Sequence, residues 1–125
     1  MQLSFTPLPD LYAIVRLPAA SLTPAWVKGP GLINVTMAED EVSIVCPSDR
    51  VPPSVKAEQG YATLRVDTLA ALDEPGVVMA AVAPIAAAGL GVFVISTHLR
   101  DYLLVRHATL PKVRSLLTEA GHVVV

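Results

Sequence analysis

The order of strand-like and helix-like segments in the second half of the chain is the strongest constraint on its fold. Apolar runs typical of strands occupy residues 61–68, 91–97, 102–107 and 122–125. Between them, helix-like patterns fill residues 73–90 and 110–121. This β-α-β-β-α-β order is the ferredoxin-like arrangement, in which a four-stranded antiparallel sheet carries two helices on one face. The sequence therefore predicts an α+β fold from residue 61 onward.

Proline and glycine positions refine the two predicted helices. Pro75 falls near the first turn of the first helix, where a missing amide is tolerated, and Gly89 lies just past its end. Pro84 lies inside this helix and should kink it, because proline removes a backbone donor and crowds the preceding turn. Pro111 starts the second helix and Gly121 stops it.

The first half of the chain looks like the same unit with reduced helices. Its predicted strands cover residues 11–17, 31–37 and 41–47. Residues 21–29 predict a short helix at best, and residues 48–60 a loop with room for one helical turn.

A weak internal repeat supports this correspondence. The run "YAIVR" at Tyr12 matches "YATLR" at Tyr61, and "EVSIV" at Glu41 matches "DYLLV" at Asp101. The offset between the copies grows along the chain, as a longer first helix in the second copy requires. Glu41 then either marks a second, degenerate site or only ends a turn. Two incomplete units in so short a chain would share one core.

Composition narrows the class of protein. The chain has 125 residues, 53% hydrophobic and 16% charged, which fits one compact domain. A net charge of −2 indicates no basic face for nucleic acid or anionic lipid. The apolar stretch 77–95 is interrupted by Pro84, Gly89 and Gly91, so we expect a helix and a strand rather than a membrane span. A single cysteine, and a start unlike a signal peptide, predict a cytoplasmic protein.

Catalytic and metal-binding patterns are weak. Ser96, His98 and Asp101 are the residue types of a hydrolase triad, but Ser96 and His98 share one short turn without a nucleophile elbow. His98, His107 and His122 lack metal-like spacing, and no glycine-rich phosphate loop is present. We therefore predict a protein that is not an enzyme and that carries neither a metal nor another cofactor.

Three segments carry a family resemblance: "EDEVSIVCP", "GVVMAAVAPIAAAGLGVFVISTHLRDYLLV" and "LLTEAGH". Over residues 11–122 the chain resembles the small tandem ACT-domain proteins, and its ACT halves are similar to those of the cytosolic arginine sensors. ACT domains are regulatory modules that bind amino acids, usually where two ACT units meet. The resemblance implies a degenerate N-terminal ACT-like unit in residues 1–60 and a C-terminal ACT unit in residues 61–125, within one compact domain.

The resemblance also implies a ligand site built from two segments. These are the loop entering the long helix and the turn before the strand that begins with an aspartate. The matching residues are Glu74, Gly76, Val77, Thr97, His98, Leu99 and Asp101. The sequence departs from the family pattern at His98, where an aromatic residue is common, and at Arg100, where a threonine or an aromatic residue is common. Because both positions face the ligand side chain in the family, the identity of the ligand stays open.

The chemistry of a free amino acid suits these segments. Its carboxylate can bind the unpaired amides at a helix N-terminus, here those of Gly76, Val77 and Val78, while Gly76 permits close approach. Its ammonium can pair with Asp101 through a charge-assisted hydrogen bond.

Two simpler interpretations remain open at this point. A carboxylate from Asp73 or Glu74 could cap the helix and occupy the same amides. Asp101 could instead hold the hairpin turn, or pair with Arg100 or Arg106.

We predict a non-catalytic regulatory protein that senses a free amino acid and works as a homodimer, with a regulated enzyme or another protein as a possible partner. The dimer is inferred from family habit and from the apolar end strand 122–125, which would otherwise leave a sheet edge open. The alternative is an ACT-type dimerisation or protein-interaction module without a ligand.

Overall fold

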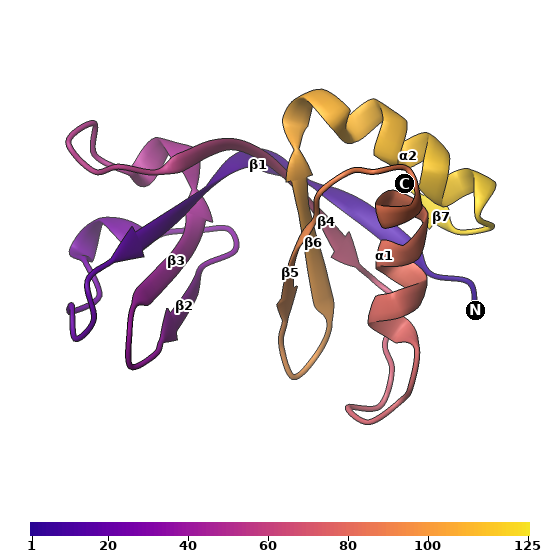
Figure 1. The fold of residues 1–125 in the computed structure, drawn as a ribbon, viewed down its shortest axis with the longest axis horizontal. Coiled ribbons are helices and arrows are strands. Elements are labelled where there is room, and N and C mark those ends of the chain that lie inside the picture. Colours follow the sequence, from indigo (N-terminus) through magenta and orange to yellow (C-terminus); the bar gives the residue numbers. More distant parts are fainter. The chain divides into compact units, whose positions relative to one another are not determined.

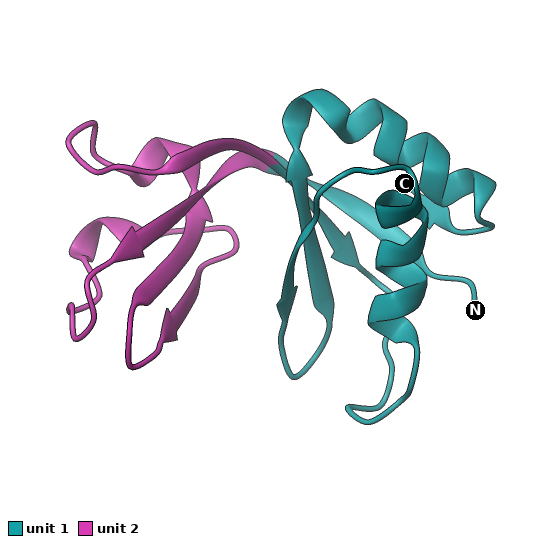
Figure 2. Cartoon of the chain, in the orientation of Figure 1, with its two compact units in different colours: residues 1–9, 62–125 teal, residues 10–61 magenta.

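The computed structural model describes all residues from 1 to 125 (Figure 1). Its strands are β1 (Ser4–Leu17), β2 (Asn34–Met37), β3 (Val42–Pro47), β4 (Glu58–Val66), β5 (Phe93–Ser96), β6 (Asp101–Arg106) and β7 (Val123–Val124). Its α-helices are α1 (Val77–Ala87) and α2 (Leu110–Glu119), and single 3-10 turns cover Ala25–Val27, Ser48–Arg50 and His107–Thr109. The chain forms two compact units: unit 1 contains residues 1–9 and 62–125, and unit 2 contains residues 10–61 (Figure 2).

Unit 1 follows the predicted order of elements. From β4 onward the chain runs β4-α1-β5-β6-α2-β7, which confirms the β-α-β-β-α-β order. The sheet nevertheless differs from the prediction, because the start of β1 joins it between β4 and β7. Ser4 and Phe5 pair in parallel with Val123 and Val124, whereas β5 and β6 pair antiparallel. The predicted antiparallel sheet with two helices is thus confirmed in its main character, but it has a fifth strand and one parallel pair, β1–β7.

Both helices of unit 1 pack on one face of this sheet. The buried residues of α1 and α2 recur at a spacing of four, which places Ala81 with Ile85, and Val113 with Leu117, on one side of each helix. Alternate residues of the strands supply the opposite wall of the core: Leu3, Phe5, Ala62, Leu64, Val66, Leu103 and Val105.

His122 fastens the N-terminal strand to helix α1. Its Nδ1 atom accepts a hydrogen bond of 2.9 Å from the amide of Leu3. Its Nε2 atom lies 3.1 Å from the carbonyl oxygen of Ala80, so Nε2 carries the proton and donates. The imidazole also meets the ring of Phe5 edge-on, with the ring centroids 5.7 Å apart. His122 is therefore a buried histidine with a structural role.

Helix α1 explains why Ala80 needs this partner. In a regular helix the amide of residue 84 would donate to the carbonyl of Ala80, but Pro84 has no amide hydrogen. His122 supplies the missing donor from outside the helix. The helix also starts later than predicted: it begins at Val77 with Gly76 as its N-cap, so Pro75 lies just before its first turn.

Unit 2 has the same order of strands with shorter connections. Residues Tyr12–Leu17 of β1 pair antiparallel with β3, which pairs antiparallel with β2. The 3-10 turns Ala25–Val27 and Ser48–Arg50 stand where unit 1 has its two helices. The core of unit 2 is small and consists of Val15, Val27, Val42, Ile44 and Cys46, with Trp26 packed against it.

The hairpins of the two units correct the alignment of the internal repeat. Met37 pairs with Val42 across the β2–β3 hairpin, and Ser96 pairs with Asp101 across the β5–β6 hairpin. Val42, and not Glu41, therefore stands in the place of Asp101. A shift of one residue moves a side chain to the other face of a strand, so Glu41 is not the structural counterpart of Asp101.

Candidate functional site

A surface cleft of about 310 Å³ lies in unit 1. One wall comes from residues in the stretch 68–79, which contains the loop after β4 and the first turn of α1. The other wall is the hairpin of residues 96–101 between β5 and β6. The cleft therefore lies where the start of a helix faces the end of a two-stranded ribbon.

Every residue of the predicted ligand site lines this cleft: Glu74, Gly76, Val77, Thr97, His98, Leu99 and Asp101. The two sequence segments that carry them are thus brought together by the fold. Their contact with a ligand stays a prediction.

The first turn of α1 leaves its amides without a side-chain cap. Gly76, the N-cap residue, has φ of 86° and ψ of −1°, and no side chain bonds to the exposed amides. The interpretation that Asp73 or Glu74 caps this helix was therefore wrong. The amides without a helical partner are those of Val77, Val78 and Met79, since the first helical bond runs from Ala80 to the carbonyl of Gly76.

Glycine is required at position 76 for its backbone conformation. The φ angle lies in the left-handed region, which side chains with a Cβ atom rarely adopt. A Cβ atom built at Gly76 would meet no other atom within 4 Å, so the space beside it is open. A substitution here would strain the backbone rather than collide with the walls of the cleft.

Thr97 holds the hairpin that forms the second wall. Its amide and its hydroxyl group both donate to the carbonyl oxygen of Arg100, each over 2.9 Å. The same hydroxyl oxygen accepts a bond of 3.2 Å from the amide of Arg100. The side chain of Thr97 is therefore occupied with the turn, while His98 and Leu99 are exposed at its tip.

Asp101 does not hold this turn. Its carboxylate makes no hydrogen bond or ion pair within the chain, since Thr97 closes the hairpin and Arg100 pairs elsewhere. Asp101 alternates along β6 with Leu103 and Val105, whose side chains belong to the core under the helices. The carboxylate of Asp101 therefore lies on the helix side of the sheet, half-buried.

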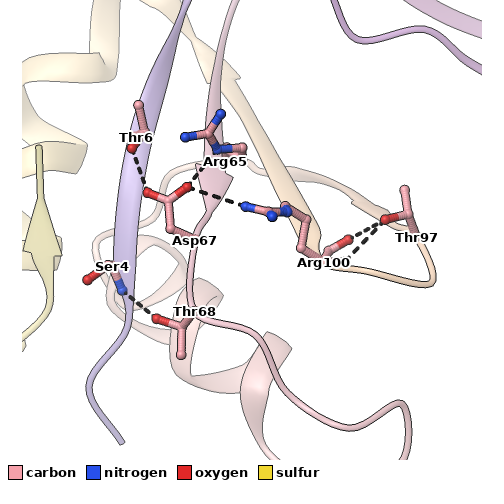
Figure 3. Close-up of polar contacts among 7 residues, drawn as sticks. All are labelled: Ser4, Thr6, Arg65, Asp67, Thr68, Thr97 and Arg100. Atoms are coloured by element: carbon pink, nitrogen blue, oxygen red, sulfur yellow. Dashed lines mark hydrogen bonds and ion pairs between the residues drawn. The ribbon is translucent and has the colours of Figure 1, made fainter.

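A further carboxylate beside the cleft, that of Asp67, was missed by sequence reasoning (Figure 3). Its Oδ2 atom accepts a 2.5 Å bond from the hydroxyl of Thr6, and its Oδ1 atom lies 2.6 Å from Nε of Arg65 and 3.5 Å from a terminal nitrogen of Arg100. Burial, the largest single effect, raises the pKa of Asp67, but the bonds from Thr6 and Arg65 and the charges of Arg65 and Arg100 together lower it below its ordinary value.

This network changes the expected role of Arg100. The position was expected to face the ligand side chain, yet its guanidinium group is directed to Asp67. Because Asp67 compensates the charge of Arg100, the charged groups of the cleft that have no partner are the carboxylates of Glu74 and Asp101. The rim is apolar, because Leu72, Met79 and Leu99 are 72%, 67% and 55% exposed.

The arrangement combines a small number of chemical groups. Unpaired amides can bind a carboxylate, an unpaired carboxylate can bind an ammonium group, and the rim can cover apolar carbon. No cluster of three or more histidine, cysteine or acidic residues is placed to hold a metal ion. No helix combines the length and the apolar character needed to cross a bilayer.

The fold and the cleft define an ACT domain. Residues 56–119, about half of the chain, match the ACT domain family model, so the chain belongs to the ACT domain family. Residues 10–54 match a separate family model described as an N-terminal domain. The predicted ACT resemblance is thus confirmed at the level of the family, and the likeness to arginine sensors stays a prediction.

Among the solved structures that match this chain is a relative aligned over its full length. Protein Atu0741 from Agobacterium tumefaciens is 38% identical, with a TM-score of 0.94, and the match covers 100% of this chain and 93% of that one. The ligand-free regulatory subunit of aspartate kinase from Thermus thermophilus matches with 10% identity and a TM-score of 0.61, over 89% of this chain and 93% of that one.

Escherichia coli aspartokinase III, solved in complex with aspartate and ADP, matches with 10% identity and a TM-score of 0.65. That match covers 94% of this chain and 32% of the kinase. Such distant likenesses establish the fold alone. Among curated protein sequences, none matches significantly.

Proposed function

We propose that this protein is a non-catalytic, cytoplasmic regulatory ACT protein that binds a free amino acid in the cleft of unit 1. The observation that carries the proposal is the pairing of opposite binding groups on the two walls. Val77, Val78 and Met79, whose amides are uncapped, line one wall, and Asp101, whose carboxylate has no partner, lines the other.

The size and chemistry of the cleft support this ligand class. Its volume of about 310 Å³ is at the small end of the roughly 300–1,000 Å³ found for ligand pockets. The ligand carboxylate binds the helix amides, whose dipole favours an anion, and the ammonium binds Asp101. Because both ends of the zwitterion are then held by the chain, the ligand side chain points to the apolar rim and to Glu74.

The proposal places one such site in each chain. Unit 2 is in this view a reduced ACT-like unit, since it repeats the order of strands but replaces both helices by 3-10 turns. A 3-10 turn of three residues does not present the set of unpaired backbone amides that the start of α1 presents.

A thermal-shift screen with each of the twenty amino acids tests the proposal. A ligand that binds only the folded state raises the melting temperature. We expect at least one amino acid to do so at millimolar concentration, and Asp101→Asn to abolish the shift. Glu41→Gln is the matched control, because it neutralises an acidic residue beside the other hairpin. Equal responses of the two variants would refute the role of Asp101.

The rival function is an interaction module without a ligand. The exposed apolar rim of Leu72, Met79 and Leu99 favours it, because large exposed apolar side chains often mark contact surfaces. Analytical ultracentrifugation with and without amino acids separates the two. A homodimer that tightens with one amino acid supports the sensor, since a ligand shifts assembly only through differential affinity. A dimer indifferent to all of them, together with a flat thermal screen, supports the interaction module.

A further inference from the structure

We propose that Asp67 is a positioning residue for the cleft, which fixes the hairpin that presents Asp101 and ties that hairpin to strand β1. The inference rests on the proposed function, because it assumes that the hairpin takes part in binding the amino acid. It concerns a residue that does not line the cleft, and it assigns a purpose to the network in Figure 3.

The first step is the contact between Asp67 and the hairpin. Arg100 reaches Asp67 with its guanidinium group, and its backbone closes the turn through both its amide and its carbonyl oxygen. Arg100 is also the residue directly before Asp101. Because β5, the outer strand of the ribbon, lies at the edge of the sheet, the tip of the hairpin has few other contacts to hold it. The position of Asp101 therefore depends on where Arg100 is held.

The second step is the attachment of Asp67 to β1. The amide of Asp67 donates to the carbonyl of Ser4 over 2.8 Å, and the amide of Ser4 donates to the hydroxyl oxygen of Thr68 over 2.9 Å. Together with the Thr6 hydroxyl bond, three hydrogen bonds join Asp67 and Thr68 to β1. Thr68 itself lines the cleft. The same short segment of β1 thus supports both walls, and β1 continues to Leu17 in unit 2.

The third step is the unequal strength of the contacts to Asp67. The bonds to Thr6 and Arg65, at 2.5 and 2.6 Å, are short and charge-assisted. The contact to Arg100, at 3.5 Å, is longer than an ordinary hydrogen bond. Asp67 is therefore firmly fixed to the sheet, whereas the contact between Asp67 and the guanidinium group of Arg100 is held by charge alone. This tether can be released without unfolding the unit.

The test compares Asp67→Asn and Arg100→Gln with the control Arg65→Gln. The control removes the shortest ion pair of Asp67 but leaves the hairpin contact in place. The first measurement is hydrogen exchange of the Thr97 and Arg100 amides in the ligand-free protein, by NMR. The second is the affinity for whichever of the twenty amino acids stabilises the wild-type protein.

We expect Asp67→Asn and Arg100→Gln each to speed exchange at both amides and to weaken affinity by about three- to tenfold. The double variant should be no worse than either single one, and Arg100→Lys, which keeps the charge, should recover most of the affinity. Arg65→Gln should leave both measurements near wild type. Equal effects of Arg65→Gln would show general loosening and overturn the inference.

The two proposals fail in different ways. A wild-type protein that responds to no amino acid overturns the proposed function and, with it, the ligand role of Asp67. A wild-type protein that binds an amino acid, with unchanged affinity in Asp67→Asn, overturns the positioning role alone.

Discussion

The link between Pro84 and His122 gives a prediction whose size follows from hydrogen-bond accounting. Pro84 withholds the helical donor from the carbonyl of Ala80, and His122 replaces it over 3.1 Å. His122→Asn keeps an acceptor in reach of the Leu3 amide but is too short to reach Ala80. The variant therefore leaves one carbonyl of the helix without a donor.

The contact to the Ala80 carbonyl is part-buried, so losing its donor should cost about 1 kcal/mol, at the low end of the range for unpaired polar groups, and the smaller side chain adds a packing loss. Pro84→Ala restores an amide at position 84 that can donate to Ala80. The cost of His122→Asn should then fall by about 1 kcal/mol in the Pro84→Ala background. The packing loss is the same in both backgrounds, so the cycle isolates the bond to Ala80.

Equilibrium urea unfolding of the wild type, both single variants and the double variant measures this coupling. Val42→Ala in unit 2 is the control partner for Pro84→Ala, because Val42 packs in the separate core of that unit. Its effect should be additive with that of Pro84→Ala. Additivity of His122→Asn and Pro84→Ala to within about 0.5 kcal/mol would refute the account of how the helix tolerates its proline.

Three further outcomes follow from burial, charge and backbone geometry. Phe5→Ala should lower the free energy of unfolding by about 3–5 kcal/mol, since Phe5 is fully buried; an effect in urea unfolding as small as that of the exposed Leu11→Ala would contradict the placement of β1 in the core. The lowered pKa of Asp67 means that its stabilising effect is present above the unfolded-state pKa and is lost as pH falls through the folded-state value. The stability of Asp67→Asn should therefore fall less steeply than that of the wild type below about pH 4. If the melting temperatures of both proteins fell equally with pH in that range, the result would count against the network. Gly76→Ala should cost about 1–3 kcal/mol through its φ of 86°; a thermal melt as stable as wild type would show that the helix start can relax.

The sequence predicted the order of elements in unit 1 because their apolar spacing is regular. Ala81 and Ile85 repeat at helical spacing, while Leu103 and Val105 alternate along a strand. The start of β1 escaped this reasoning, since Pro7 and Pro9 interrupt a run that otherwise alternates, and prolines argue against a strand. Only the structure shows that Leu3 and Phe5 are fully buried there.

The residues that line the cleft could be predicted from the sequence, but the network that holds the hairpin in place could not. The family resemblance indicated both walls of the cleft, and hydrophobic periodicity placed them at the start of a helix and at a hairpin. Arg65 lies near the end of β4 and Asp67 directly follows that strand, so in extended chain the two share a face and could have been paired from sequence. Their link to Arg100 could not, because it requires knowing that β4 lies beside β6.

The match to the ACT family leaves out the segments that hold the cleft in place. Residues 56–119 include both walls of the cleft. They do not include β1, His122 or β7. Ser4 and Thr6 of β1 hold the loop of the first wall, and Leu3, just before β1, is linked to helix α1 through His122. All three residues precede unit 2 in the chain. Unit 2 is therefore inserted into unit 1 rather than placed before it. The geometry of the cleft accordingly depends on a strand whose other end belongs to unit 2.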